Sequence, residues 1–244
     1  MRNIKLDLCY EGTRYRGWQR QPGVDNTIQG KLEQTLSRIL EEPIEVFGSG
    51  RTDAGTHALN QVASFHCSST MPAEKILEEL RRYLPEDIGI YSCRDCSPRF
   101  HARLNARKKT YCYRVWNSVQ PCVFDRRYVH IDPSDYDVAA MQEAAQQFVG
   151  QHDFSAFCAT HETKKSTVRA VTAIEVSRVG EEIRFSVTGT GFLRHMVRIM
   201  VGTLLEIGRG QREASTIPAL FGARREEAGE LMPAKGLCLM GVEY

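Results

Sequence analysis

The segment Gly48-Ser49-Gly50-Arg51-Thr52-Asp53-Ala54-Gly55-Thr56-His57 contains three glycines and a single carboxylate. Apolar and polar residues roughly alternate on both sides of it, over 44–47 and 58–65, as is typical of strands. Glycine lets the chain turn sharply and lets a second molecule approach the backbone. The pattern therefore predicts a loop between two strands, with Asp53 beside Arg51, whose charge can keep the carboxylate ionised.

Three interpretations of this loop compete. Asp and Gly are ordinary turn formers, so a turn without any function explains it. A phosphate-binding loop is the second, because Gly50 and Gly55 have the P-loop spacing, but Thr56-His57 stands where Lys and Ser or Thr are required. The start, Gly48-Ser49-Gly50, also resembles a dinucleotide fingerprint, yet a strand-like run follows it and not a helix. A catalytic Asp on a strand-to-strand loop is the third interpretation.

The segments around the loop predict a split β-α-β unit. Ile4, Leu6 and Leu8 alternate with polar residues, which indicates a strand. Thr27 can cap a helix that Pro43 stops, and a second helix starts near 69–72 before a strand from Ile88. The apolar faces of the two helices are formed by Ile28, Leu32, Leu36, Ile39 and Leu40, and by Ile76, Leu77, Leu80 and Leu84. This is the ferredoxin-like element order.

The second half of the chain predicts the same order again. Strands are expected over 110–116, 168–176, 183–187 and 237–242, and helices over 135–148 and 193–207, the second ended by Gly208. No flexible linker marks the join near 104–109. We therefore expect an α+β fold with two ferredoxin-like (RRM-like) subdomains, 1–105 and 106–244. They would form one extended, mostly antiparallel sheet with a basic central cleft.

The bulk properties are those of an ordinary globular protein. The chain has 244 residues, of which 42% are hydrophobic and 25% charged. No apolar run approaches the roughly 20 residues of a membrane span, and the start, Met1-Arg2-Asn3-Ile4-Lys5, leads directly into an alternating segment. We expect a cytoplasmic protein without membrane association.

The eight cysteines are scattered, so reduced thiols are expected. Cys93 and Cys96 form the one C-x-x-C pair. A zinc site would need a second pair of ligands at suitable spacing, and a redox motif would open a helix after a strand. Because neither condition is met, we expect no metal at this pair.

Charge is distributed unevenly, although the formal net charge is only +2, which by itself argues weakly against a nucleic-acid partner. Basic residues gather in three segments, two of them beside aromatic residues, while acidic pairs lie elsewhere. This mixture suits RNA phosphates and unstacked bases, but a solvated surface explains any single cluster equally well. The clusters are Arg14, Arg16 and Arg20; Arg99, Arg103, Arg107, Lys108 and Lys109; and Arg194, His195 and Arg198.

Further segments carry a joint pattern. They are Tyr10-Glu11-Gly12-Thr13-x-Tyr15-x-Gly17-Trp18-Gln19-Arg20-Gln21, Gly50-Arg51-Thr52-Asp53-Ala54-Gly55-x-His57, Phe100-His101-Ala102-Arg103, Tyr111-x-Tyr113, Phe192-Leu193-x-His195-Met196-Val197-Arg198-x-Met200-Val201-Gly202 and Gly236-Leu237-x-Leu239. Together they resemble the tRNA pseudouridine synthase A family over nearly the whole chain. Each piece alone would be weak, but the ordered set is highly specific.

The resemblance implies an isomerase that converts uridine to pseudouridine at positions 38 to 40 of the tRNA anticodon arm, and that works as a homodimer. It assigns the catalytic carboxylate to Asp53, stacking on the flipped uracil to Tyr111, pairing with the carboxylate to Arg198, and displacement of the base to Arg51. The reaction has no redox step and no group donor, so no cofactor, nucleotide or metal is expected. Whether Asp53 attacks C6, attacks C1′ or removes a proton at C2′ stays open.

Other interpretations of the site residues also stay open. Tyr111 could be a core residue of its strand, and Tyr113 shares its sheet face. Arg198 could be a surface side chain lying over Val197 and Val201. The residues expected to contact RNA are Arg14, Arg16, Arg20, Arg103, Lys108 and Lys109.

Two other classes of protein compete with the isomerase. A non-catalytic RNA-binding module of doubled ferredoxin-like type would not require Asp53 in a tight glycine loop, where its charge would repel phosphate. A phosphoryl-transfer enzyme would require the missing P-loop Lys or a cluster of metal-binding carboxylates.

Overall fold

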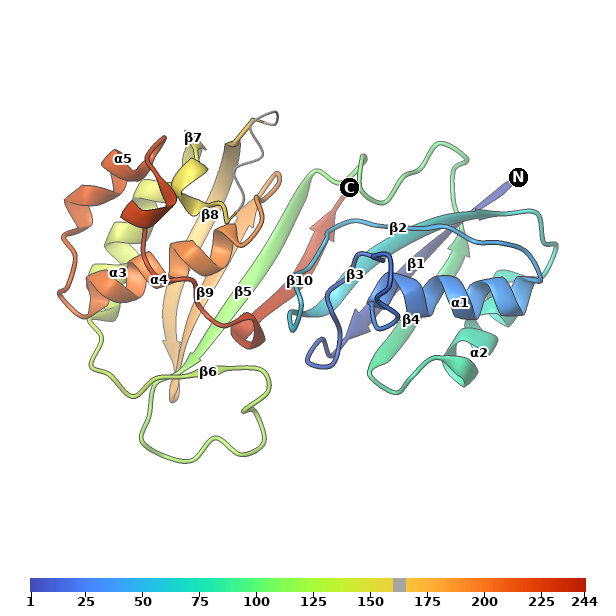
Figure 1. The fold of residues 1–244 in the computed structure, drawn as a ribbon, viewed down its shortest axis with the longest axis horizontal. Coiled ribbons are helices and arrows are strands. Elements are labelled where there is room, and N and C mark those ends of the chain that lie inside the picture. Colours follow the sequence, from blue (N-terminus) through green and yellow to red (C-terminus); the bar gives the residue numbers. More distant parts are fainter. Residues whose placement is uncertain (160–165) are drawn as a thin grey trace. The chain divides into compact units, whose positions relative to one another are not determined.

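The computed structural model describes residues 1–159 and 166–244, which form two compact units. Unit 1 comprises Met1–Arg107 and Leu239–Tyr244, and unit 2 comprises Lys108–Cys238. The fold is α+β with mostly antiparallel strand pairing, as expected from the sequence (Figure 1). The division expected from the sequence falls after residue 105 and includes the chain's last residues in the second half, whereas Leu239–Tyr244 group with unit 1.

Unit 1 has the predicted ferredoxin-like order. Strand β1 pairs antiparallel with both β3 and β4, the strand order is β4-β1-β3-β10, and β2 pairs with β3. Its elements are β1 (Arg2–Tyr10), α1 (Ile28–Leu40), β2 (Val46–Gly48), β3 (His57–Cys67), α2 (Ala73–Tyr83) and β4 (Ile88–Asp95), with most of β10 (Leu237–Glu243).

The predicted apolar faces form the core of unit 1. Ile4, Leu6 and Leu8 of β1 are completely buried, as are Leu32 and Leu36 of α1. Full burial of each such side chain contributes about 1.5–3 kcal/mol, so alternation on the strand and helical periodicity on α1 together specify this layer.

The helix ends of unit 1 are partly those expected. The Thr27 side chain accepts a hydrogen bond from the amide of Gly30, so Thr27 is the predicted N-cap. The helix already ends at Leu40, because Glu41 adopts a left-handed conformation with φ 54°, and Pro43 therefore does not stop it. In α2, Pro72 is the N-cap residue and makes no side-chain cap.

Unit 2 has the strand order β5-β9-β8-β7, and β6 runs parallel to β5. Its strands and α-helices are β5 (Lys108–Trp116), β6 (His130–Ile131), α3 (Val138–Ala145), β7 (Gly150–Asp153), β8 (Val168–Val179), β9 (Glu182–Gly189), α4 (Met196–Gly208) and α5 (Ile217–Leu220). Short 3-10 turns cover Gln146–Phe148, Ser155–Phe157, Ala214–Thr216, Arg225–Glu227 and Ala234–Gly236.

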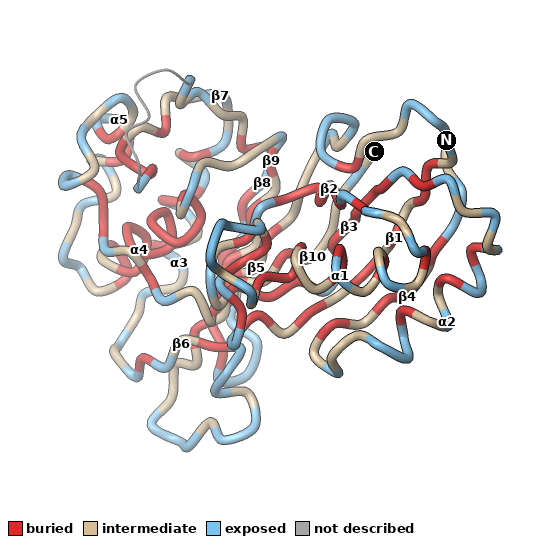
Figure 2. The backbone as a smooth tube through the Cα atoms, turned by 45° about the vertical axis from the view of Figure 1, so that its right-hand side comes forward, coloured by how far each residue is buried: buried red, intermediate tan, exposed pale blue. Residues whose placement is uncertain are grey.

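The core of unit 2 is built around α4, which is buried along nearly its whole length (Figure 2). Phe148, Phe154 and Phe157 are completely buried beside it in edge-to-face and stacked ring contacts. The helix begins three residues later than predicted, at Met196, because His195 before it has a left-handed φ of 67°. The predicted helix over 135–148 is α3 followed by a 3-10 turn, and β6 and β7 were not predicted.

Candidate active site

The loop of Asp53 connects β2 to β3, as the sequence predicted. Asp53 is half-buried, and its carbonyl accepts a hydrogen bond from the amide of Thr56 at 3.1 Å, which closes a turn. Gly55 in this turn has φ 77°, the left-handed region that favours glycine. The carboxylate is therefore carried on a short, closed turn.

The segment 11–21 packs directly against this turn, backbone on backbone. The amide of Trp18 donates to the carbonyl of Thr52 at 3.0 Å, and the amide of Gly55 donates to the carbonyl of Tyr15 at 3.2 Å. A Cβ on Gly12 would lie 2.0 Å from the carbonyl oxygen of Thr56. The segment 11–21 therefore supports the Asp53 loop through backbone contacts that leave no room for a side chain at Gly12.

His57, the first residue of β3, also contacts the 11–21 segment. The amide of Gly12 donates to Nδ1 of His57 at 3.0 Å. The carboxylate of Glu11 lies 3.6 Å from the same nitrogen, a contact that is an ion pair only if His57 is protonated. His57 here serves as an acceptor for backbone.

A fully buried amide, Gln61 on β3, lies under the loop. Its Oε1 accepts from the Ser49 hydroxyl at 2.5 Å and from the amide of Gly50 at 3.3 Å. Its Nε2 donates to the carbonyl of Gly50 at 2.9 Å and to the Tyr10 hydroxyl at 3.3 Å. Tyr10 in turn shares a 2.8 Å hydrogen bond with the hydroxyl of Thr52.

Gln61 was not among the site residues predicted from the sequence. The available signal was a polar residue at the start of the mostly apolar run Gln61-Val62-Ala63-Ser64-Phe65. Such a residue is buried only with hydrogen-bond partners, but the sequence does not show which backbone groups the fold brings to it.

Arg51 and Arg103 are two predicted residues that lie near each other in unit 1. Both are exposed. Partial burial of the Arg103 guanidinium lowers its pKa, and the positive charge of Arg51 lowers the pKa further. Like charges held close favour an anion between them. The amide of Arg103 donates to Nδ1 of His101 at 3.1 Å. The His101 ring packs against Phe47, with 4.8 Å between the ring centroids.

The three cations of the 11–21 segment differ in their partners. Arg14 forms a salt bridge with the carboxylate of Asp87, and Arg20 forms one with Glu33 at 3.1 Å. Both guanidinium groups remain well exposed at their outer edges, and Arg16 is also exposed. Lys108 and Lys109 are half-buried at the start of β5 in unit 2.

Tyr111 and Tyr113, which their spacing in the sequence could not distinguish, differ in how deeply unit 2 encloses them. Tyr113 is completely buried, and its hydroxyl donates to the carbonyl of Pro233 at 2.8 Å. Burial raises the pKa of Tyr113. Tyr111 keeps 8% of its surface exposed, and its ring meets Phe192 edge-to-face at 5.3 Å. Tyr113 is therefore fully enclosed in the core, and Tyr111 is also buried but is the less enclosed of the two.

Arg198 lies on the first turn of α4 and is buried, with 9% of its surface exposed. Its Nε donates to the carbonyl of Met232 at 2.6 Å. The interpretation as a surface side chain extended over Val197 and Val201 is therefore wrong. Arg194, expected from the sequence to lie on the same helix, precedes α4 and is exposed.

The cysteine pair has the properties of inert thiols. Cys93 is buried, and burial raises its pKa to about 12; burial also raises the pKa of Cys96. Because the thiolate is the form that binds metals and reacts, both are poor ligands. Within residues 1–159 and 166–244, no group of three His, Cys, Asp or Glu side chains is arranged to hold a metal ion.

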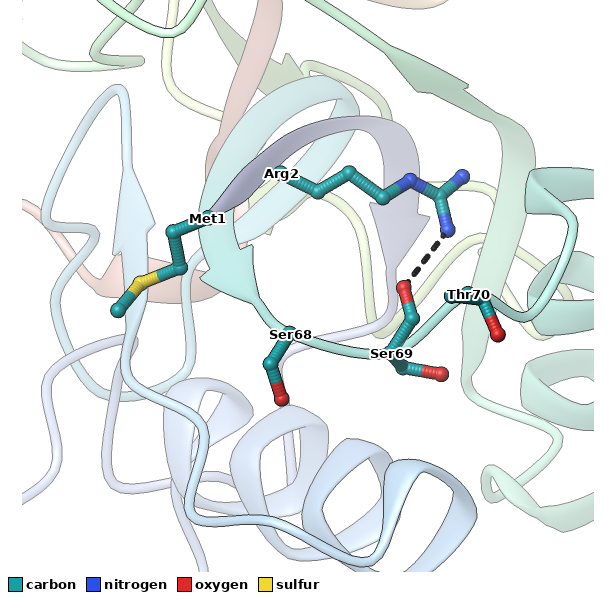
Figure 3. Close-up of a pocket in the computed structure, with 5 residues that line it drawn as sticks. All are labelled: Met1, Arg2, Ser68, Ser69 and Thr70. Atoms are coloured by element: carbon teal, nitrogen blue, oxygen red, sulfur yellow. Dashed lines mark hydrogen bonds between the residues drawn. The ribbon is translucent and has the colours of Figure 1, made fainter.

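Unit 1 also contains a hollow, which lies away from the Asp53 loop. A hollow of about 580 Å³ lies in unit 1 beside Met1, Arg2, Ser68, Ser69 and Thr70 (Figure 3). The hollow lies at the end of β3 that is opposite to the Asp53 loop. There the Arg2 guanidinium donates to the Ser69 carbonyl at 3.2 Å.

None of the helices in the described part of the chain is long and apolar enough to span a membrane.

Comparison with known proteins identifies the family of the chain. A family described as "tRNA pseudouridine synthase" matches residues 9–128 and 144–244. "tRNA pseudouridine synthase A 2" of Bacillus cereus (strain ZK / E33L) is 44% identical to this chain, and the protein of the same name from Clostridium perfringens (strain 13 / Type A) is 42% identical. "tRNA pseudouridine synthase A" of Bacillus sp. (strain KSM-64) is 41% identical. All three alignments cover 100% of both chains.

An α+β protein with these matches is an enzyme of the isomerase class. The chain belongs to the tRNA pseudouridine synthase family.

Proposed function

We propose that this enzyme converts uridine to pseudouridine at positions 38 to 40 of the tRNA anticodon arm, with Asp53 as its catalytic group. The observation that carries the proposal is the Asp53 turn, a lone carboxylate half-exposed on a glycine-rich loop whose backbone is bonded to the 11–21 segment on one side. A turn without function would not need this bracing. Full-length relatives that bear the name tRNA pseudouridine synthase A support the substrate class.

The chemistry requires a group that can form and release a bond close to the sugar and ring. The N1–C1′ glycosidic bond breaks, the uracil turns, and C5 bonds to C1′, while C5 loses a proton and N1 gains one. A carboxylate can act as such a nucleophile or as a base. Because atoms and electrons balance within the uridine itself, the step needs no donor, oxidant or reductant.

The target base must leave its stack to reach Asp53, at a cost of a few kcal/mol. We assign stacking on the freed ring to Tyr111, which is less enclosed than Tyr113, and displacement of the base to Arg51. We assign pairing with the carboxylate to Arg198, whose buried guanidinium is held by the Met232 carbonyl. Arg51 and Arg103, which repel each other without an anion, suit an RNA phosphate.

Arg14, Arg16, Arg20, Lys108 and Lys109 complete the set of proposed RNA contacts. We further propose that the enzyme works in the cytoplasm as a homodimer. Exposed apolar side chains on the loop between β5 and β6 support a protein contact there, since Val119 is 85% exposed and Phe124 is 92% exposed.

The direct test is incubation of an unmodified tRNA transcript with the purified enzyme, without any cofactor, and measurement of pseudouridine at each position. We expect modification at positions 38 to 40 and its loss in transcripts with cytidine there. Asp53→Asn should abolish turnover while tRNA binding persists. Asp25→Asn, which changes an exposed carboxylate of the same unit, is the control. An Asp53→Asn enzyme that turns over near the parent rate would falsify the catalytic assignment.

A further inference from the structure

We propose that Gln61 is a positioning residue for catalysis, and that it acts with Tyr10 to fix the backbone that carries Asp53. The proposal rests on the catalytic role proposed for Asp53. Gln61 has no exposed surface and so cannot touch the substrate. Its effect on the reaction must pass through the loop.

Gln61 is connected by hydrogen bonds to most of residues 49–52, which directly precede Asp53. Its amide group bonds both backbone polar groups of Gly50 and the hydroxyl of Ser49. Through Tyr10 it reaches Thr52, whose side chain is bonded to the Tyr10 hydroxyl at 2.8 Å. A single buried side chain thus restrains three of the positions 49–52 immediately before the catalytic carboxylate.

The chemistry of the primary amide is what the position requires. An amide has an acceptor oxygen and two N–H donors, so one side chain can accept from Ser49, Gly50 and the amide of Val62. It also donates to Gly50 and Tyr10. Glutamate lacks the donors, and methionine of similar volume lacks donors and acceptors. The Tyr10 hydroxyl, which accepts from Nε2, also shares a hydrogen bond with the Thr52 hydroxyl, in which either group can donate.

This arrangement matters because Gly50 alone would be a weak point. Glycine has the largest conformational freedom of any residue, and it lies three residues before Asp53. Bonds to both of its backbone polar groups remove that freedom. A displacement of about 1 Å in a reacting group can cost on the order of 100-fold in rate, so the bonds at Gly50 bear directly on turnover.

Tyr10→Phe is the mild variant that tests the proposal. It keeps the ring, which lies 6.0 Å from Trp18, and removes only the hydroxyl between Gln61 and Thr52. We expect kcat to fall by roughly 10-fold or more while KM for tRNA stays within about twofold. Tyr136→Phe is the matched control, because it removes a half-buried hydroxyl that donates to Asp132 in unit 2. It should lower Tm by a similar amount and leave kcat unchanged.

Gln61→Met and Gln61→Glu test the residue itself. Gln61→Met should lower kcat by on the order of 10- to 100-fold. In Gln61→Glu an oxygen faces the Gly50 carbonyl, and burial raises the pKa of such a carboxyl group. Protonation restores one donor, so the ratio of variant to parent kcat should rise between about pH 8 and pH 6. A residue with a purely structural role would give no such pH-dependent rescue.

The outcomes are distinguishable from failure of the proposed function. If Asp53→Asn is inactive but Tyr10→Phe and folded Gln61 variants keep the parent kcat, positioning by Gln61 is wrong and the function stands. If Asp53→Asn remains active, the catalytic assignment itself is wrong. Should both Gln61 variants fail to fold, the comparison of Tyr10→Phe with Tyr136→Phe still decides: equal kcat in the two overturns the proposal.

Discussion

Tyr111 and Tyr113 illustrate what a single residue's surroundings add to its place in the sequence. They lie two positions apart on one strand and on one face, so periodicity treats them alike. Tyr113 is enclosed, and a Cβ on Gly236 would come within 2.5 Å of its ring. Tyr111 is also buried but less enclosed than Tyr113, and its role against uracil stays a prediction.

Substitutions at Tyr111 test stacking separately from proton transfer. Tyr111→Phe keeps a ring that can stack and loses only the hydroxyl, so we expect reduced kcat with little change in KM. Tyr111→Leu removes the aromatic face as well, and base–aromatic stacking is worth about 1–3 kcal/mol, so kcat/KM should fall further. Steady-state kinetics on tRNA measures both. Full activity in both variants would mean that Tyr111 is only a core residue.

Residues of the candidate site divide by how they could be predicted. Asp53 and Arg51 stand out because glycine spacing around a charged residue is visible in the chain. Gln61 could not be assigned a role, because the fold brings its partners to it: the Tyr10 hydroxyl from β1, and the Ser49 hydroxyl and Gly50 backbone from the 49–52 segment. The buried state of Arg198 likewise depends on the Met232 carbonyl, 34 positions later in the chain.

At the scale of elements, alternation and helical periodicity predicted the strands and helices that cover the core. The helix ends that were predicted wrongly depend on unusual backbone conformations. The helix α1 ends at a left-handed Glu41, and α4 starts after a left-handed His195. Non-glycine residues adopt this conformation only where surrounding structure imposes it, so local sequence could not show either limit.

The contact between the 11–21 segment and the Asp53 loop gives a prediction of its own. Gly12→Ala would place a methyl group 2.0 Å from a backbone oxygen, so the two segments must separate. We expect a loss of unfolding free energy of about 1–3 kcal/mol and a lower kcat. Gly241→Ala is the control, since nothing lies within 4 Å of the added atom. Thermal unfolding and kinetics measure both effects, and a Gly12→Ala enzyme indistinguishable from Gly241→Ala would contradict the packing described.

Asp132 connects the end of β6 with the helices α3 and α4 of unit 2. Burial alone would raise its pKa, but hydrogen bonds from Ser134 and Tyr136, together with the charge of Arg209, hold the pKa well below its usual value. A lowered folded-state pKa means that the stabilisation is fully present above the unfolded value of about 3.9 and is lost as pH falls through and below it.

We therefore expect Asp132→Asn to lower the unfolding free energy by about 1–3 kcal/mol at neutral pH. The difference from the parent should shrink below about pH 4. Denaturant unfolding at several pH values measures it, with exposed Asp135→Asn as the control. A difference that does not change with pH would show that the charge of Asp132 contributes nothing.

At the scale of the whole molecule, net charge conceals the distribution. A formal charge of +2 suggests weak attraction to RNA, yet Arg16, Arg51 and Arg103 are all exposed in unit 1, while acidic Glu226 and Glu227 lie on a turn of unit 2. A basic cleft between the two halves stays a prediction. The composition could indicate a soluble globule but not which charges face the substrate.

Salt dependence tests the proposed RNA contacts. If about five phosphates are neutralised, log affinity for tRNA should fall with log salt at a slope of roughly −3 to −5. Arg16→Glu should weaken binding to all tRNAs and flatten that slope, whereas Glu226→Lys should do little. Binding titrations on an Asp53→Asn background separate affinity from turnover. Equal effects of the two variants would remove the electrostatic basis of the proposal.

The last strand has a consequence for how the chain is made. Glu243 accepts a hydrogen bond from the amide of Arg107, the Tyr244 hydroxyl donates to the Ala102 carbonyl, and Asn60 bonds to Met240, all within unit 1. Residues 239–244 leave the ribosome after all of unit 2. Unit 1 is therefore synthesised first but completed last, and its β3 edge must wait for its partner through the translation of more than a hundred residues. Such distant pairing slows folding and leaves unpaired strand edges exposed to aggregation, so we expect nascent unit 1 to keep an exposed β3 edge until residues 239–244 arrive.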